Sequence, residues 1–284
     1  MEILHIGLIG DPVAHSYSPR FQQPVLDALG IPARYELWQT PASELPTRIA
    51  SLRHPQYLGA NVTIPHKEAV LPLLDEIDPV AARIGAVNTI VHRDGLLLGY
   101  NTDAPGLLQA LAEQGFGQPN NTTISLQGYT AILLGAGGAA RGAAFALSTA
   151  SLTHLIIVNR HLDRAQRLAA ELQQHIDCHA LSLNDLDLLT PNANSLILNA
   201  TSVGMHEDLS LLPLEILARF PLNTLVLDMI YNPTETKLLR QARTLGLRTL
   251  NGLPMLLHQG ALSFTLWTGQ PAPLERMRQA LLYA

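Results

Sequence analysis

The sequence has little of what several classes of protein depend on. It holds one cysteine in 284 residues, so it can form neither an internal disulfide nor a zinc site built from cysteines. Charged residues make up only 14% of the chain, the formal net charge is −5, and the lysines and arginines form no cluster. We therefore expect no nucleic-acid partner, and the low charge argues against a disordered chain.

Long apolar runs and the common hydrolase and metal motifs are missing too. No uncharged apolar run approaches the roughly 18–20 residues that span a bilayer, and the first residues lack the basic segment of a secretory signal. The eleven histidines include no H-E-x-x-H spacing, and there is no G-x-S-x-G. We therefore expect a cytoplasmic protein with no membrane association, no bound metal and no Ser–His–Asp chemistry.

What the sequence does contain is a core and a regular alternation of strands and helices. Hydrophobic residues make up 47% of the chain, which is enough to form a core. The length of 284 residues suits two domains of roughly 100–200 residues each. In the first part, strands are predicted at 3–9, 35–39, 58–62, 87–92 and 96–100, and helices at 18–29, at 43–53 and from Pro65 onward. Ser18 is the predicted N-cap of the first helix, and Asp94-Gly95 between two apolar runs predicts a hairpin.

The alternation becomes sharper in the second part of the chain. Strands are predicted at 131–134, 155–158, 195–198 and 225–228, and helices at 105–114, 139–148, 255–267 and 274–282. Short buried strands that alternate with helices are typical of a parallel sheet covered by helices on both faces. We therefore predict an α/β protein with a doubly wound sheet here, preceded by an α/β unit that carries the antiparallel hairpin.

A glycine-rich segment, Gly135-Ala136-Gly137-Gly138-Ala139-Ala140, lies between a predicted strand and the helix that follows it. It fits the G-x-G-x-x-A pattern of dinucleotide-binding proteins. Gly135 allows a tight turn, Gly137 allows close approach of a pyrophosphate, and Ala140 lets the helix pack closely on the strand. The N–H groups at the start of the helix would bind the phosphates. The segment therefore predicts a dinucleotide cofactor.

The end of the next predicted strand indicates which dinucleotide is bound. NAD-binding proteins usually have an acidic residue there, which holds the adenosine ribose. This chain has Asn159-Arg160 at that point, and Arg164 follows one helical turn later. Guanidinium groups bind phosphate oxygens bidentately, so two arginines suit the 2′-phosphate of NADP(H). We therefore predict NADP(H) as the cofactor.

Polar clusters at predicted strand ends indicate a second site. They occupy residues 10–19, 61–67, 85–89 and 99–103 and contain hydroxyls, amides and a few charges. Ligands of open α/β sheets bind at the carboxyl ends of the strands. Because hydroxyl and amide groups can both donate and accept hydrogen bonds, these clusters suit a polyhydroxylated ligand.

The motifs in these clusters resemble those of the shikimate dehydrogenase family. They read S-x-S-P at 16–19, N-V-T-x-P-x-K at 61–67, G-A-x-N-T at 85–89 and N-T-D at 101–103, and further matching segments lie at 199–205, 228–236 and 252–259. The resemblance covers nearly the whole chain. It implies an N-terminal α/β substrate domain and a Rossmann-type, doubly wound NADP-binding domain, with the C-terminal helices returning to the substrate domain. The implied domains are residues 1–103 with 252–284, and residues 104–251.

The same resemblance implies roles for individual residues. Lys67 and Asp103 are implied as the catalytic acid–base pair. The implied substrate-binding residues are Ser16, Ser18, Thr63, Asn88, Thr102, Tyr231 and Gln259. The cofactor-binding residues are Gly135, Ala136, Gly137, Gly138, Ala139, Asn159, Arg160, Arg164, Thr201, Gly252 and Met255. The chain departs from the family pattern at Gln22-Gln23, where His-Asn is usual, and at His161, where Thr is usual.

The function that the resemblance implies is the reversible, NADPH-dependent reduction of 3-dehydroshikimate to shikimate, by a monomer or homodimer. Three alternatives remain open from the residues alone. One is a quinate/shikimate dehydrogenase that uses NAD, against which Arg160 and Arg164 count. Another is a dinucleotide-dependent sensor without chemistry, against which Lys67 and Asp103 count. The third is a dehydrogenase that acts on a different cyclic acid.

Overall fold

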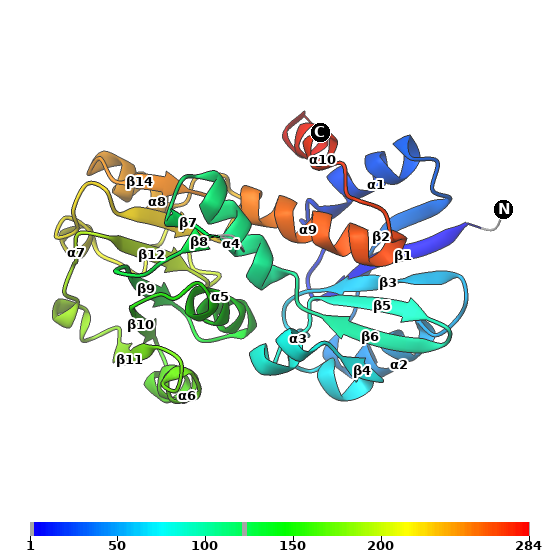
Figure 1. Ribbon diagram of the computed structural model, residues 1–284, viewed down its shortest axis with the longest axis horizontal. Helices are drawn as coiled ribbons and strands as arrows, with labels where there is room; N and C mark the ends of the chain where they lie inside the picture. Colours follow the sequence, from blue (N-terminus) through cyan, green and yellow to red (C-terminus); the bar gives the residue numbers. More distant parts are fainter. Residues whose placement is uncertain (1–2, 121–123, 284) are drawn as a thin grey trace. The chain divides into compact units, whose positions relative to one another are not determined.

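A computed structural model describes residues 3–120 and 124–283 and divides the chain into two compact units. Unit 1 comprises Met1–Gly106 and Leu256–Ala284, and unit 2 comprises Leu107–Met255. Each unit is built on its own six-stranded sheet (Figure 1). The last two helices of the chain thus belong mainly to the same unit as its first hundred residues.

The sheet of unit 1 has the strand order β2-β1-β3-β5-β6-β4. Its strands are β1 (Leu4–Gly10), β2 (Ala33–Gln39), β3 (Tyr57–Val62), β4 (Glu76–Ile77), β5 (Thr89–Arg93) and β6 (Leu96–Tyr100). Strand β1 pairs in parallel with β2 and β3, whereas β5 pairs antiparallel with β3 and β6. The carboxyl ends of β1, β2 and β3 therefore lie along one edge of the sheet.

Five α-helices lie wholly or mainly in the described part of unit 1. They are α1 (Ser18–Ala28), α2 (Leu45–Ser51), α3 (Pro79–Ile84), α9 (Leu253–Thr268) and α10 (Leu274–Tyr283), with the 3₁₀ helices η1 (Ala42–Glu44) and η2 (Leu71–Leu73). Helix α1 packs against α10, as Figure 1 shows. Buried side chains of β1, β3, β5, β6 and α2, such as Ile9, Val62 and Ile90, form one core cluster of this unit.

The predicted hairpin is confirmed. Strands β5 and β6 pair with Arg93 opposite Leu96, so the turn between them consists of Asp94 and Gly95. Both turn residues have positive φ angles, 51° for Asp94 and 84° for Gly95. A two-residue hairpin turn needs positive φ angles at both residues to match the right-handed twist of its two strands, and Asp-Gly adopts this conformation readily.

Two local predictions in unit 1 are wrong. No α-helix begins at Pro65, because the Lys67 carbonyl accepts a hydrogen bond from the Val87 N–H (2.8 Å) instead of from the residue four positions on. Ser18 is not the N-cap of α1 either. The cap position is Tyr17, and the N–H of Ser18 donates to the Ser16 hydroxyl (3.2 Å). Helix α3, capped by Asp78, was not predicted.

The sheet of unit 2 is parallel throughout, with the order β11-β10-β9-β12-β13-β14. Its strands are β9 (Thr130–Leu134), β10 (His154–Asn159), β11 (Asp177–Ser182), β12 (Ser195–Asn199), β13 (Leu225–Asp228) and β14 (Arg248–Leu250). In chain order this is 3-2-1-4-5-6, which is the doubly wound dinucleotide-binding topology. The predicted fold class is confirmed.

Helices and short strands complete unit 2. The helices are α4 (Asp103–Glu113), which begins in unit 1, α5 (Gly138–Thr149), α6 (Leu162–Leu172), α7 (Leu214–Leu217) and α8 (Lys237–Thr244), with the 3₁₀ helix η3 (Leu186–Leu188). Strands β7 (Gln118–Pro119) and β8 (Ile124–Ser125) form a small separate sheet. The central strands β9 and β12 are buried along their whole length, which agrees with a sheet covered on both faces.

The described residues contain neither a membrane-spanning helix nor a cluster of metal ligands. Within residues 3–120 and 124–283, no helix is long and apolar enough to cross a membrane. Over the same residues, no group of three or more His, Cys, Asp or Glu side chains is arranged to hold a metal ion.

Candidate active site

The polar segments that follow β1 and β3 meet at the carboxyl-end edge of the unit 1 sheet. The N–H of Thr63 donates to the Ile9 carbonyl (2.8 Å), and the N–H of Asp11 donates to the Ile64 carbonyl (3.0 Å). A Cβ atom on Gly10 would lie 2.4 Å from Cγ2 of Thr63, so glycine is needed for this close approach. The sequence clusters at 10–19 and 61–67 are therefore neighbours in space.

Lys67 and Asp103 form a buried ion pair. Lys67 Nζ lies 2.6 Å from Asp103 Oδ2, and their side chains are only 14% and 9% exposed. Asp103 is the first residue of α4, whereas Lys67 follows β3, so residues 36 positions apart are brought together. A charge-assisted hydrogen bond of this length fixes the position of the ammonium group.

Asn88 orients the carboxylate of this pair from the other side. Its Nδ2 donates to Asp103 Oδ1 (2.9 Å) and to the Thr102 hydroxyl (2.9 Å), and its Oδ1 accepts from the Thr102 N–H (2.7 Å). Each Asp103 oxygen thus has its own donor, one from Asn88 and one from Lys67. Asn88 is 2% exposed, so its amide has no competing solvent.

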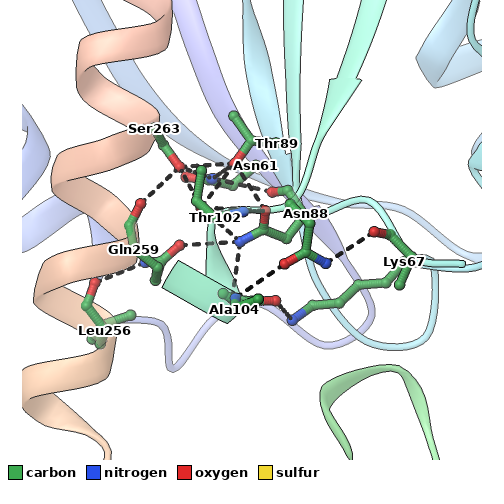
Figure 2. Close-up of polar contacts among 12 residues, drawn as sticks. Asn61, Lys67, Asn88, Thr89, Thr102, Ala104, Leu256, Gln259 and Ser263 are labelled. Atoms are coloured by element: carbon green, nitrogen blue, oxygen red, sulfur yellow. Dashed lines mark hydrogen bonds and ion pairs between the residues drawn. The ribbon is translucent and has the colours of Figure 1, made fainter. Parts of the chain in front are cut away.

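Gln259 joins this group from helix α9. Its Oε1 lies 3.4 Å from Asn88 Nδ2, and its Nε2 donates to the Leu256 carbonyl (2.8 Å) within the helix. Figure 2 shows Gln259 and Ser263 on one helix, facing Asn88 and Thr102. Of the sequence-predicted residues in unit 1, the structure thus brings together Lys67, Asn88, Thr102, Asp103 and Gln259.

The other predicted substrate residues of unit 1 lie beside the ends of β1 and β3. Ser16 and Ser18 contact each other, with 3.2 Å between their hydroxyl oxygens, at the start of α1. Thr63 directly follows β3, four residues before Lys67, and is partly exposed. The structure shows no hydrogen bond that joins Ser16, Ser18 or Thr63 to the Lys67–Asp103 pair among the described contacts.

The sequence interpretation assigned no role to three buried polar residues behind this group. They are Asn61, Thr89 and Ser263, which are at most 4% exposed and hydrogen-bond to one another. Asn61 and Thr89 stand inside the quoted motifs, and Ser263 lies four positions after Gln259. The helical i, i+4 spacing puts Ser263 on the same face of α9 as Gln259, which was the available signal.

In unit 2 the glycine-rich segment forms the turn from β9 into α5. Gly135 has φ +113° and donates its N–H to the Val158 carbonyl (2.8 Å). Gly137 is the N-cap of α5, no side chain caps the helix, and nothing lies within 4 Å of where a Cβ on Gly137 would stand. Ala136, Gly138 and Ala139 complete this opening. The turn therefore offers backbone N–H groups to an anion, and it fits a pyrophosphate.

The end of β10 carries no carboxylate. Asn159 is its last residue, and its Nδ2 donates to the His161 carbonyl (2.9 Å), which shapes the turn into α6. Arg160 and Arg164 follow, and both are exposed. Exposed guanidiniums beside a turn of this kind fit a phosphate on an adenosine ribose.

Thr201 and Gly252 lie at the carboxyl end of the unit 2 sheet. Thr201 follows β12, and a Cβ on Gly135 would lie 3.0 Å from its Cγ2, so Thr201 borders the glycine-rich turn. Gly252 packs so closely on the chain after β13 that a Cβ there would lie 2.1 Å from the Met229 carbonyl oxygen. Tyr231 follows the same strand, and Met255 is a partly buried residue of α9.

Asp228, the last residue of β13, is a fully buried carboxylate in the same region. Burial raises the pKa of Asp228, and three hydrogen bonds oppose that effect. Its donors are Asn199 Nδ2 (2.9 Å), the Ile230 N–H (3.0 Å) and the Thr236 hydroxyl (2.7 Å). The carboxylate thus connects the end of β12, the segment that follows β13 and the start of α8.

The fold and the two sites define a class of protein: an α/β dinucleotide-binding protein whose other unit holds a buried lysine–carboxylate pair among amides and hydroxyls. Three family models match the chain. The shikimate dehydrogenase substrate binding domain matches residues 8–90, the shikimate / quinate 5-dehydrogenase model matches 112–206, and the shikimate 5′-dehydrogenase C-terminal domain matches 252–282.

Individual relatives agree with these models. A shikimate dehydrogenase (NADP(+)) of Geobacillus kaustophilus is 43% identical over 278 residues, which is 98% of this chain and 97% of that protein. The crystal structure of shikimate 5-dehydrogenase from Thermus thermophilus in complex with NADP(H) and shikimate is 41% identical, with a TM-score of 0.85 over 99% of both chains. A 5-ketofructose reductase of a Gluconobacter strain is 32% identical, with a TM-score of 0.83 over 99% of this chain and 98% of that one. The chain belongs to the shikimate dehydrogenase family.

Proposed function

We propose that this protein is an NADP-dependent shikimate dehydrogenase that interconverts 3-dehydroshikimate and shikimate. The observation that carries the proposal is the buried Lys67–Asp103 pair, with 2.6 Å between Nζ and Oδ2, in a setting of amides and hydroxyls. Family membership supports it, since relatives that match nearly the whole chain are NADP-dependent shikimate dehydrogenases. The structure of unit 2 supports the cofactor, because its topology and its glycine-rich turn fit a dinucleotide.

In the direction of reduction, Lys67 donates a proton to the oxygen that develops negative charge on the ketone. When bound, NADPH supplies the hydride to the carbonyl carbon. Asp103 holds the Lys67 ammonium in place and keeps a lone pair available for a substrate hydroxyl. In oxidation, Lys67 takes the proton back. Asn88 fixes the carboxylate, so the pair is set before substrate arrives.

The remaining predicted residues bind the rest of the substrate. Ser16, Ser18, Thr63 and Gln259 are proposed to hydrogen-bond the hydroxyls and the carboxylate of shikimate, because each can donate or accept. Thr102 is 3% exposed and hydrogen-bonds Asn88, so it contributes by holding that side chain. Tyr231 is proposed to line the same pocket from the segment after β13.

Cofactor choice is assigned to the turn after β10. NAD-binding Rossmann folds usually have an acidic residue at the end of this strand, where the chain has Asn159. Arg160 and Arg164 are proposed to bind the 2′-phosphate of NADP(H). Thr201, Gly252 and Met255 are proposed to shape the nicotinamide end, because the half of the sheet formed by β12 to β14 takes the second mononucleotide.

Initial rates of cofactor reduction at 340 nm test the proposal, with shikimate and quinate each offered together with NADP⁺ and with NAD⁺. We expect the shikimate–NADP⁺ pair to be preferred over each of the other three. Comparable rates with quinate or NAD⁺ would contradict the specificity proposed here. A protein that binds NADP⁺ but reduces 5-ketofructose rather than 3-dehydroshikimate with NADPH would place it with the Gluconobacter relative.

A further inference from the structure

Ser263 sits at the centre of a buried hydrogen-bond network in unit 1. It lies on helix α9, four residues after Gln259, and its side chain is fully buried. Figure 2 shows it facing Asn61, Thr89 and Thr102 from the helix side. Four groups surround its hydroxyl oxygen: Asn61 Nδ2 (3.1 Å), Thr89 Oγ1 (2.8 Å), Thr102 Oγ1 (3.1 Å) and the Gln259 carbonyl (3.0 Å).

The chemistry of these neighbours fixes the direction of two of the four hydrogen bonds. A serine hydroxyl has one hydrogen and two lone pairs. The Gln259 carbonyl can only accept and Asn61 Nδ2 can only donate, so Ser263 donates to the first and accepts from the second. One lone pair remains for the threonine hydroxyls, and both Thr89 Oγ1 (2.8 Å) and Thr102 Oγ1 (3.1 Å) lie within hydrogen-bond distance of it. Ser263 is therefore a shared partner of the two threonine hydroxyls.

The threonine hydroxyls also contact Asn88. The Thr89 hydroxyl donates to Asn88 Oδ1 (3.1 Å), and Thr102 Oγ1 accepts from Asn88 Nδ2 (2.9 Å). Asn88 Oδ1 also accepts from the Thr102 N–H (2.7 Å). The amide then keeps its Nδ2 turned toward Asp103 Oδ1 (2.9 Å).

We propose that Ser263 is a positioning residue for the reaction, which acts through Thr89 and Asn88 on the orientation of Asp103 and so of Lys67. Ser263 does not touch the reacting atoms in this scheme. The inference rests on the proposed function, because it concerns the acid–base pair of that same site. It adds a contribution from helix α9, whose Ser263 carries no role in the assignments above.

The fold is expected to survive loss of the Ser263 hydroxyl. Alanine has a higher helix propensity than serine, and the former partners keep other hydrogen bonds. Asn61 Nδ2 still has the Asn88 carbonyl (3.1 Å) and the Thr89 hydroxyl (3.2 Å). What changes in Ser263→Ala is that the Thr89 and Thr102 hydroxyls lose a shared partner, so they hold Asn88 less firmly.

The test compares Ser263→Ala with a matched control on the same helix, Thr265→Val. Thr265 also donates to the carbonyl four residues earlier (3.1 Å to Ala261), but it is exposed and lies outside the network. For the wild type and both variants, kcat, the KM for shikimate, the KM for NADP⁺ and the Tm are measured.

We expect Ser263→Ala to lower kcat/KM for shikimate about tenfold or more, with the KM for NADP⁺ within about twofold of wild type, and Thr265→Val to match the wild type. Unchanged shikimate kinetics in Ser263→Ala would overturn the inference. An equal rise in the KM for shikimate and in the KM for NADP⁺, together with a lower Tm, would also overturn the inference, because such a result indicates general damage to the protein. An inactive wild type would instead reject the proposed function. Should Ser263→Ala not fold, Thr89→Val is expected to show the same split, and its absence there would overturn the inference.

Discussion

At the scale of single residues, the chain stabilises its buried carboxylates in two different ways. Asp103 shares its two oxygens between a lysine ammonium and the Asn88 amide. Asp228 has three hydrogen-bond donors, and none of them is charged. A buried ion without a counter-ion keeps part of its desolvation cost, which agrees with the raised pKa of Asp228.

Asp228→Asn is expected to change how stability depends on pH. The folded-state pKa of Asp228 is raised above the unfolded value of about 3.9. Its contribution to the unfolding free energy is therefore fully present below about pH 4 and is lost as the pH rises through the folded-state pKa. Asparagine does not ionise, and its Oδ1 and Nδ2 can still bond Asn199, Ile230 and Thr236.

Urea denaturation of wild type and Asp228→Asn from pH 4 upward measures this effect. The unfolding free energy of the wild type, relative to the variant, should fall as the pH rises. A difference that stays constant or grows with pH would contradict a raised pKa of Asp228 in the folded state.

The cofactor assignment makes a second prediction at this scale. Replacing Arg160 and Arg164 with alanine should raise the KM for NADP⁺ about ten- to a hundredfold, because the 2′-phosphate loses its guanidinium partners, and should leave the KM for NAD⁺ nearly unchanged. Arg167→Ala is the control, since Arg167 lies on the same helix and pairs with Asp163 (2.6 Å). Steady-state rates with each cofactor measure both KM values. Equal losses for NADP⁺ and NAD⁺ would show that the two arginines do not read the phosphate.

At the scale of elements, local signals predicted the parts of the fold that local chemistry determines. The β5–β6 hairpin followed from Asp94-Gly95, and the glycine-rich turn into α5 followed from its spacing. The helix predicted from Pro65 failed because a tertiary hydrogen bond, from Val87 to the Lys67 carbonyl, takes an acceptor that a helix would use. No pattern within residues 63–70 contains that information.

The site divides in the same way. Lys67, Asn88 and Asp103 stand in motifs that resemble those of the family, so the sequence alone singles them out as candidates. Ser263 is one polar residue on a largely apolar helix, and its proposed role depends on the side chains that the fold packs around it. Three of its four neighbours, Asn61, Thr89 and Thr102, come from three other segments, which a sequence taken by itself does not bring together.

The hairpin supplies a prediction about stability. Gly95→Ala should lower the unfolding free energy by about 1–2 kcal/mol, because Gly95 has φ +84° and a side chain is strained there. Nothing lies within 4 Å of where its Cβ would stand, so the cost is one of backbone conformation alone. Asp94→Asn is the control, since asparagine tolerates the left-handed conformation. Thermal unfolding measures both variants. A Gly95→Ala protein as stable as the wild type would contradict the assigned turn.

At the scale of the whole molecule, the two halves of one reaction are assigned to two compact units. Unit 2 has the doubly wound topology and the glycine-rich turn of a dinucleotide site, and unit 1 has the buried Lys67–Asp103 pair. In the proposed mechanism, the hydride and the proton are handled by separate parts of the chain. Each unit has its own sheet, so damage to one function need not abolish binding by the other.

The most direct test of this central claim is the turnover of Lys67→Ala measured beside its ligand binding. With shikimate and NADP⁺, we predict that kcat falls by about two to four orders of magnitude, while the Kd values for NADP⁺ and for shikimate, from calorimetry, change far less. Turnover close to that of the wild type would show that Lys67 does not carry the proton and would contradict the proposed mechanism.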